Sequence, residues 1–210
     1  MASQVAAAPG APISAPLNRT EQVIERLVRR RVAVSLLLFA GLIVLDLFVF
    51  RSRPRDVLQL RDPLVAVSDA LIALGLLIRS WAAGTLRKKK HLATTGPYAW
   101  IRNPLYFGSF LMMVGFAILV QDPLTLWIVI GPLAWLYWQA VRSEERQMAE
   151  IFPDEWPEYA AAVPRFIPRR FVWPLAGEWS LAQWRHNLEW QAWLGSAGAL
   201  FGTKLWLNAF

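Results

Sequence analysis

Residues 105–141 read LYFGSFLMMVGFAILVQDPLTLWIVIGPLAWLYWQAV, two apolar blocks joined by a short polar connection. The blocks, 105–120 and 124–141, approach the roughly 20 residues that cross a hydrocarbon core about 30 Å thick. The connection is short enough for only a tight turn. Pro132 lies inside the second block, where we expect it to kink a helix. This stretch therefore predicts a helical hairpin in a membrane.

Further apolar blocks lie on both sides of this hairpin. Residues 32–50 and 64–83 predict two earlier spans, and the basic amphipathic segment 20–31 leads into the first. A last block, 188–207, also contains polar and charged residues, so it could be a fifth span or an interfacial helix. We therefore predict an all-α integral membrane protein with about five transmembrane helices.

The composition agrees with a membrane protein and excludes several kinds of site. Hydrophobic residues make up 56% of the chain, whereas soluble domains are usually about 45–50% apolar. The net charge is +7, but the basic residues flank apolar blocks, so we expect no nucleic acid partner. The chain lacks cysteine, which excludes disulfides and thiolate chemistry. With His91 and His186 as the two histidines, we expect no metal site.

Lys and Arg are unevenly distributed among the segments that connect the predicted spans. If the N-terminus is inside, sixteen of them face the cytoplasm and four do not. Cytoplasmic segments of membrane proteins carry the excess of positive charge, so we predict a cytoplasmic N-terminus. The loop before 105–120 and the extension after 124–141 then lie on the same, cytoplasmic, side.

Two carboxylates lie inside predicted spans, near the ends that face outward. Asp46 is four residues from the end of the first span, and Asp69 is near the start of the second. Ionisable groups at membrane depth are functional candidates, but both could also pair with Arg51 or Arg53 at the outer interface.

The first of two segments suited to chemistry is GPYAWIRNPLYFG, residues 96–108. Pro104 fits the first turn of a helix, whose free N–H groups and positive dipole end favour an anion. Arg102 can hold a carboxylate with two parallel hydrogen bonds. Tyr98 and Tyr106 offer aromatic faces, which suit an adenine ring or a sulfonium.

The second segment is SEERQMAEIFPDEWPEYAAAVPRFIP, residues 143–168. Glu144 and Glu145 lie at the inner end of the fourth span. Adjacent helical residues point about 100° apart, so we expect only one of the two to face a pocket. Such a carboxylate could bind an amino group or ribose hydroxyls. Alternatively, these glutamates form a solvated face, Arg102 is a positive-inside anchor, and the tyrosines belong to an interfacial belt.

Taken in order, GPYAWIRNPLYFG, a helix, EERQM and EYAAAVPRFIP resemble the isoprenylcysteine carboxyl methyltransferase family, which is related to phospholipid N-methyltransferases. The resemblance covers about residues 86–170. It implies an integral membrane enzyme that uses S-adenosylmethionine and has a cytoplasmic cofactor pocket formed by the hairpin and the segment after it.

The resemblance also implies roles for individual residues. Arg102 and Glu145 would be catalytic, and Arg165 would bind substrate. The cofactor-binding residues would be His91, Gly96, Pro97, Tyr98, Arg102, Asn103, Tyr106, Glu144, Glu145 and Tyr159. Asn103 stands where prenylcysteine enzymes have histidine, and because it does not titrate near neutral pH it is not suited to accept a proton.

Four segments follow from this interpretation. We expect a disordered tail over 1–19, transmembrane helices over 20–85, the methyltransferase core over 86–170, and a C-terminal segment with a further membrane helix over 171–210. The implied function is methylation of a lipophilic acceptor, either an isoprenylcysteine carboxylate or another small lipid. A non-catalytic membrane scaffold and a membrane lipid reductase are the alternatives. The sequence leaves open the acceptor group and the oligomeric state.

Overall fold

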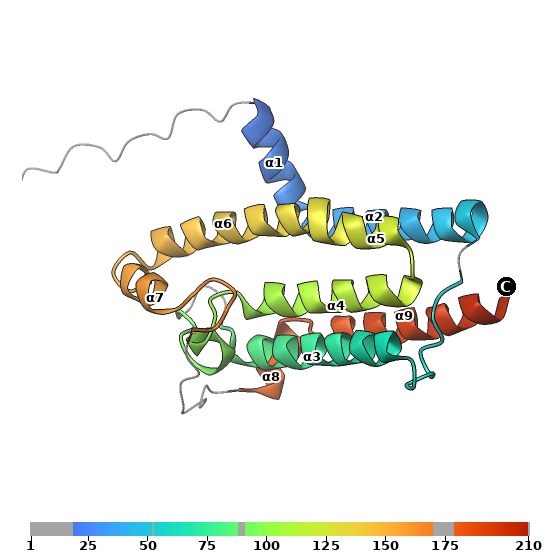
Figure 1. Ribbon diagram of the computed structural model, residues 1–210. Coiled ribbons are helices and arrows are strands. Elements are labelled where there is room, and N and C mark those ends of the chain that lie inside the picture. Colours follow the sequence, from blue (N-terminus) through green and yellow to red (C-terminus); the bar gives the residue numbers. More distant parts are fainter. Residues whose placement is uncertain (1–18, 52, 88–90, 170–178, 210) are drawn as a thin grey trace, which may run out of the picture.

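The computed structural model describes residues 19–51, 53–87, 91–169 and 179–209 (Figure 1). Every regular element in these ranges is a helix, which confirms the predicted all-α class. The predicted disordered tail, apart from its last residue, lies outside the described residues. So do residues 171–178 of the predicted C-terminal segment, and residues 88–90 and 170 of the predicted core.

The helices follow the apolar blocks of the sequence closely. They are α1 (Arg19–Arg29), α2 (Arg31–Leu45), the π-helix η1 (Asp46–Phe50), α3 (Pro63–Thr85), the 3₁₀ turn η2 (Gly96–Ala99), α4 (Pro104–Val120), α5 (Pro123–Ile128), the π-helix η3 (Val129–Leu133), α6 (Ala134–Ile151), α7 (Trp156–Ala162), α8 (Leu181–His186) and α9 (Trp190–Ala209).

Three helical runs among the described residues are long and apolar enough to cross a membrane. They are Ala33–Phe50, Pro63–Thr85 and Pro123–Ile151, and α4 is a shorter apolar helix between the last two. The four predicted spans are thus apolar helices. Helix α9 has 20 residues but is not one of these runs. A total of five spans therefore stays a prediction.

Local sequence signals set the helix ends. Asp62 caps α3 by accepting a hydrogen bond from the Leu64 N–H, and Asp122 caps α5 in the same way through Thr125. A proline occupies the first turn of both helices, where its missing N–H costs no hydrogen bond. Pro132 lies in the π-helix η3, so the helix widens there and continues to Ile151.

Helices α3 and α4 form the most extensive helix pair, and glycine allows their backbones to approach closely. A Cβ on Gly75 would lie 2.5 Å from the Gly108 carbonyl oxygen, and one on Gly115 would lie 2.8 Å from the Ser68 carbonyl oxygen. Small residues at a helix contact are typical of membrane bundles.

The C-terminal helices lie along the same pair (Figure 1). The Asn187 amide donates to the carbonyls of Ala83 and Leu86, at 2.7 and 2.9 Å, and so caps the end of α3. Arg79 of α3 forms an ion pair with buried Glu189 at 2.8 Å. At one end of the bundle, η2, α7 and the start of α4 come together (Figure 1), and the predicted site lies there.

Candidate active site

A cavity of about 310 Å³ lies at this end of the bundle. Its lining comes from the loop before α4, the first turn of α4, the end of α6 and α7. Eight of the ten predicted cofactor residues line it: His91, Tyr98, Arg102, Asn103, Tyr106, Glu144, Glu145 and Tyr159. Its volume lies at the lower end of the roughly 300–1,000 Å³ typical of small-molecule sites.

Gly96 and Pro97 do not line the cavity, although both were predicted to bind cofactor. They form the buried turn that places Tyr98. Gly96 has a φ of +61°, a backbone conformation that residues with a side chain rarely adopt. The predicted turn is therefore present, and its contribution to the cavity is indirect.

Glu145 is the centre of a polar cluster. It is 8% exposed, and its carboxylate accepts hydrogen bonds from the Asn103 amide at 2.9 Å and from Arg165 at 2.7 and 2.9 Å. The Nε of Arg102 lies 3.5 Å from the same carboxylate. A buried carboxylate needs such compensation, because an unpaired charge in the interior is very costly. The cluster joins the start of α4 to α6 and to the segment after α7.

Glu144 lines the cavity as well, so both glutamates face it, and the expectation that one would do so was wrong. Glu144 accepts a hydrogen bond of 2.8 Å from the Tyr106 hydroxyl. The Tyr106 ring packs edge-on against Tyr137, with ring centroids 5.7 Å apart. Glu145 thus binds cationic groups and an amide, and Glu144 binds the phenol of Tyr106.

Arg102 is held in place from both its backbone and its side chain. Its backbone N–H donates to the Pro164 carbonyl at 2.9 Å, and its Nη1 donates to the Ala160 carbonyl at 3.1 Å. The guanidinium also lies over the Trp156 ring, 5.8 Å from the centroid. Arg102 thus joins the segment just before α4 to α7 and the residues after it, at the wall of the cavity.

The hydroxyls of two buried tyrosines differ in their hydrogen bonding. Tyr159 donates to the Tyr98 carbonyl at 2.9 Å, whereas the buried Tyr98 hydroxyl has no hydrogen-bond partner in the described structure. Burial raises the pKa of both phenols above the usual value. Both therefore stay protonated at neutral pH, and Tyr98 can offer its proton to a ligand.

Arg165, the predicted substrate residue, does not line the cavity. It lies behind Glu145 and over the Trp138 ring, 5.0 Å from the centroid. Conversely, Trp156, Gln147 and Met148 line the cavity although the sequence interpretation did not select them. Trp156 precedes a proline in the segment Trp-Pro-Glu-Tyr, and its aromatic character was the available signal. Within the described ranges, there is no group of three or more His, Cys, Asp or Glu residues that could hold a metal ion.

Comparisons with known proteins agree with this picture. Residues 64–155 match the family described as phospholipid methyltransferase. The chain is 34% identical over 112 residues to the nickel-cobalt-cadmium resistance protein NccN of Alcaligenes xylosoxydans xylosoxydans, covering 49% of this chain and 52% of that protein. It is 32% identical over 124 residues to the cobalt-zinc-cadmium resistance protein CzcN of Cupriavidus metallidurans, covering 55% and 57%.

It is also 36% identical over 85 residues to the protein-S-isoprenylcysteine O-methyltransferase of Saccharomyces cerevisiae, covering 40% of this chain and 36% of that enzyme. The matches thus span little more than half the length of the two resistance proteins and about a third of the length of the methyltransferase. No solved structure matches the chain. The resemblance to the isoprenylcysteine carboxyl methyltransferases is confirmed, and it lies in the same part of the chain that matches the phospholipid methyltransferase family.

Proposed function

We propose that this protein is a membrane methyltransferase that uses S-adenosylmethionine and acts on a lipophilic acceptor. The observation that carries the proposal is the convergence of eight predicted residues, from segments about 50 residues apart in sequence, on one cavity. The methyltransferase relatives support it and do not favour the scaffold or the reductase.

The chemistry of the cavity fits this cofactor. Its wall combines acidic groups, guanidinium and phenol donors, and aromatic faces. An amino acid group, a ribose and an adenine need carboxylates, hydrogen-bond donors and aromatic surface, respectively. The buried Tyr98 hydroxyl gives the most direct support, because a ligand in the cavity would supply the partner that it lacks. When bound, S-adenosylmethionine supplies a methyl group activated by its sulfonium charge.

The residues of the chain would position this group and shield it. Arg102 and the open N-terminus of α4 offer donors for a carboxylate, and the Asn103 side chain leaves those N–H groups free because it does not cap the helix. Glu144 offers a carboxylate for an amino group or hydroxyls. Glu145 fixes Asn103 and Arg165, and lies beside Arg102. Catalysis then rests on alignment and on exclusion of water.

The nature of the acceptor determines whether a base is needed. A carboxylate acceptor is already nucleophilic, so no side chain has to remove a proton. A protonated amine or thiol would require a base, and Glu144, which lines the cavity and accepts a hydrogen bond from the Tyr106 hydroxyl, is the candidate. We propose that residues 86–170 form the catalytic core, and that the cavity opens to the cytoplasm with the N-terminus on the same side.

Binding of S-adenosylhomocysteine tests the proposal. By calorimetry on the purified protein in detergent, we expect micromolar affinity for the wild type. Arg102→Ala should weaken this affinity at least tenfold, because it removes a charge-assisted contact to the ligand carboxylate. Glu145→Gln should do the same, because it weakens the charge-assisted contact that holds Arg165 in place beside Asn103. Such contacts are worth roughly 1.5–3 kcal/mol.

Matched controls lie on the exposed face of α6. Arg146→Ala and Glu150→Gln change the same residue types outside the cavity and should leave the affinity within about twofold, the effect usual for surface changes. Absence of binding to a monodisperse wild type would refute the proposal.

A further inference from the structure

A buried ion pair joins the C-terminal segment to α3. The Glu189 carboxylate is 2% exposed and accepts two hydrogen bonds from Arg79, at 2.9 Å from its Nε and 2.8 Å from its Nη2. Burial raises the pKa of the Glu189 carboxyl, and the guanidinium of Arg79 opposes that rise. The match to the phospholipid methyltransferase family ends at residue 155. Glu189 therefore belongs to a part of the chain that the family match does not cover.

The backbone just before Glu189 adopts an unfavourable conformation. Leu188 has a φ of +58°, in the left-handed region that residues with a branched or bulky side chain rarely adopt. Strained backbone persists only where the surrounding structure holds it in place. Here the Asn187 amide donates to two carbonyls at the end of α3, and Glu189 binds Arg79. The turn between α8 and α9 therefore depends on the contacts that Asn187 and Glu189 make with α3.

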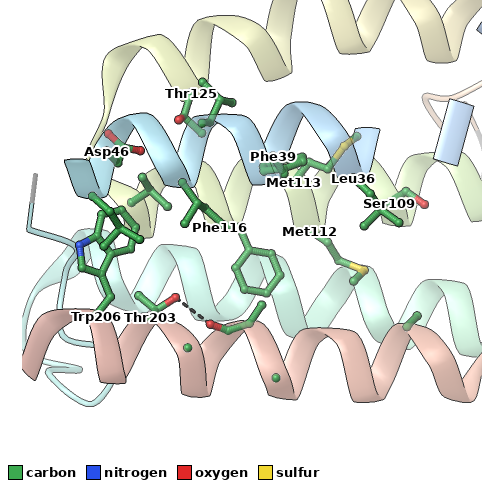
Figure 2. Close-up of a pocket in the computed structure, with 18 of the residues that line it drawn as sticks. Leu36, Phe39, Asp46, Ser109, Met112, Met113, Phe116, Thr125, Thr203 and Trp206 are labelled. Carbon is green, nitrogen blue, oxygen red and sulfur yellow. Dashed lines mark hydrogen bonds between the residues drawn. The ribbon is translucent and has the colours of Figure 1, made fainter. Parts of the chain in front are cut away.

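Arg79 also contacts α4, between two cavities. A second cavity, of about 580 Å³, is bounded mainly by α2, α4 and α9, and Arg79 and Ser109 line it. Ser109 lies at one end of it, away from Asp46 and Trp206 (Figure 2). The Nη1 of Arg79 donates to the Ser109 hydroxyl at 2.5 Å and to the Leu105 carbonyl at 3.4 Å. Leu105 lines the first cavity, that of the candidate active site, so the guanidinium lies directly behind its wall.

The charges of this ion pair act on the first cavity. Tyr98 lines that cavity, and burial is the main cause that raises the pKa of its phenol. Among the charged groups, Arg79 lowers this pKa and Glu189 raises it, so both charges reach the Tyr98 hydroxyl. Their effects are opposite because their charges are opposite. Without Glu189, the positive charge of Arg79 would act on the cavity uncompensated.

We propose that Glu189 is a positioning residue of the candidate active site: it neutralises Arg79, so that the first cavity can hold a positively charged sulfonium. The inference rests on the proposed function, because the sulfonium is that of S-adenosylmethionine. Removing one partner of a buried ion pair leaves the other charge uncompensated, and an uncompensated guanidinium would repel a sulfonium nearby. Glu189 also fixes the guanidinium that contacts the Leu105 carbonyl, and so steadies the first turn of α4.

A purely structural role for Glu189 predicts a different result. A simple tether between the C-terminal segment and α3 would affect the binding of S-adenosylmethionine and S-adenosylhomocysteine alike. The two ligands differ at sulfur, which is a cationic sulfonium in the first and a neutral thioether in the second. Lys204 and Asp56 form a comparable tether, at 2.7 Å, between α9 and the loop before α3, and neither residue lines the two cavities. This second ion pair is therefore a matched control.

Calorimetry with both ligands on each variant tests the proposal. Glu189→Gln should weaken S-adenosylmethionine binding about five- to twentyfold more than S-adenosylhomocysteine binding, the change that a unit charge causes over about 10–15 Å at an effective dielectric constant of about 20. Asp56→Asn should keep the ratio of the two affinities within about twofold of the wild type. The double variant Arg79→Gln/Glu189→Gln removes both charges and should restore the wild-type ratio, even where both ligands bind more weakly.

If Glu189→Gln does not fold, Arg79→Gln takes its place. It leaves the carboxylate without its cation, so the ratio should shift in favour of S-adenosylmethionine, and an unchanged ratio would overturn the inference.

The remaining outcomes separate this inference from the proposed function. A wild type that binds both ligands, with an unchanged ratio in Glu189→Gln, would overturn the role of Glu189 and leave the proposed function intact. An equal shift of the ratio in Asp56→Asn, or a ratio that the double variant does not restore, would do the same. A folded wild type that binds neither ligand would refute both.

Discussion

Tyr98 and Tyr159 lie in contact at the wall of the first cavity, but their hydroxyls have opposite energetic roles. The Tyr159 hydroxyl forms a buried hydrogen bond to the Tyr98 carbonyl, and its loss would leave that carbonyl without this donor. The Tyr98 hydroxyl is buried without a partner, so it lowers the stability of the ligand-free protein. A group that costs stability and faces a cavity is a candidate for ligand binding.

Substitution by phenylalanine separates these roles. Tyr98→Phe should raise or preserve the melting temperature, because it removes one unsatisfied buried hydroxyl. It should weaken S-adenosylhomocysteine binding about three- to tenfold, because the ligand loses that hydroxyl as a hydrogen-bond donor. Tyr159→Phe should instead cost about 1 kcal/mol of stability. Thermal unfolding and calorimetry on both variants check this pair. A Tyr98→Phe protein that binds as tightly as the wild type would remove Tyr98 from the site.

At the scale of the helices, the α3–α4 pair positions the start of α4. Arg102 and Asn103 lie just before that helix. Its close approach depends on Gly75, Gly108 and Gly115, because added Cβ atoms would meet backbone carbonyls of the partner helix. Gly41 of α2 has nothing within 4 Å of such a Cβ. The same substitution should therefore have opposite effects at the two kinds of position.

We expect Gly115→Ala to destabilise the protein by about 1–3 kcal/mol, the usual cost of overpacking. Gly41→Ala should be neutral or stabilise by up to about 1 kcal/mol, since alanine favours the helix. Thermal unfolding in one detergent compares the two. Equal shifts of the melting temperature for both variants would contradict the close packing of α3 against α4.

The sequence predicted the helices well, because their signals are local. Each of two helices starts with an Asp-Pro pair just before its apolar block, namely Asp62-Pro63 and Asp122-Pro123. The contacts between helices were less accessible. Arg79 and Glu189 are 110 residues apart in sequence, and no local pattern pairs them. Likewise, Glu145 and Arg165 were both selected from motifs, but their ion pair is a tertiary contact.

At the scale of the whole molecule, the two ends of the bundle differ. The residues that line the first cavity lie at one end. The other end holds the connection between α4 and α5 together with the loop between η1 and α3 (Figure 1). The distribution of Lys and Arg predicts that the first end faces the cytoplasm.

Because the chain has no cysteine, single-cysteine variants test this orientation without background. Thr94 lies in the exposed loop before η2, and Gln59 lies exposed in the loop before α3. A membrane-impermeant maleimide applied to intact cells should label Gln59→Cys and should reach Thr94→Cys only after permeabilisation. The reverse pattern would place the first cavity outside.

The central claim is that the cavity lined by Tyr98, Arg102, Glu144 and Tyr159 binds S-adenosylmethionine. Ultraviolet cross-linking of methyl-tritiated S-adenosylmethionine to the purified protein, followed by peptide mapping, tests it most directly. We predict label in peptides from 91–106 or 144–159, removed by excess S-adenosylhomocysteine. Label confined to other peptides, or label that S-adenosylhomocysteine does not displace, would contradict the claim.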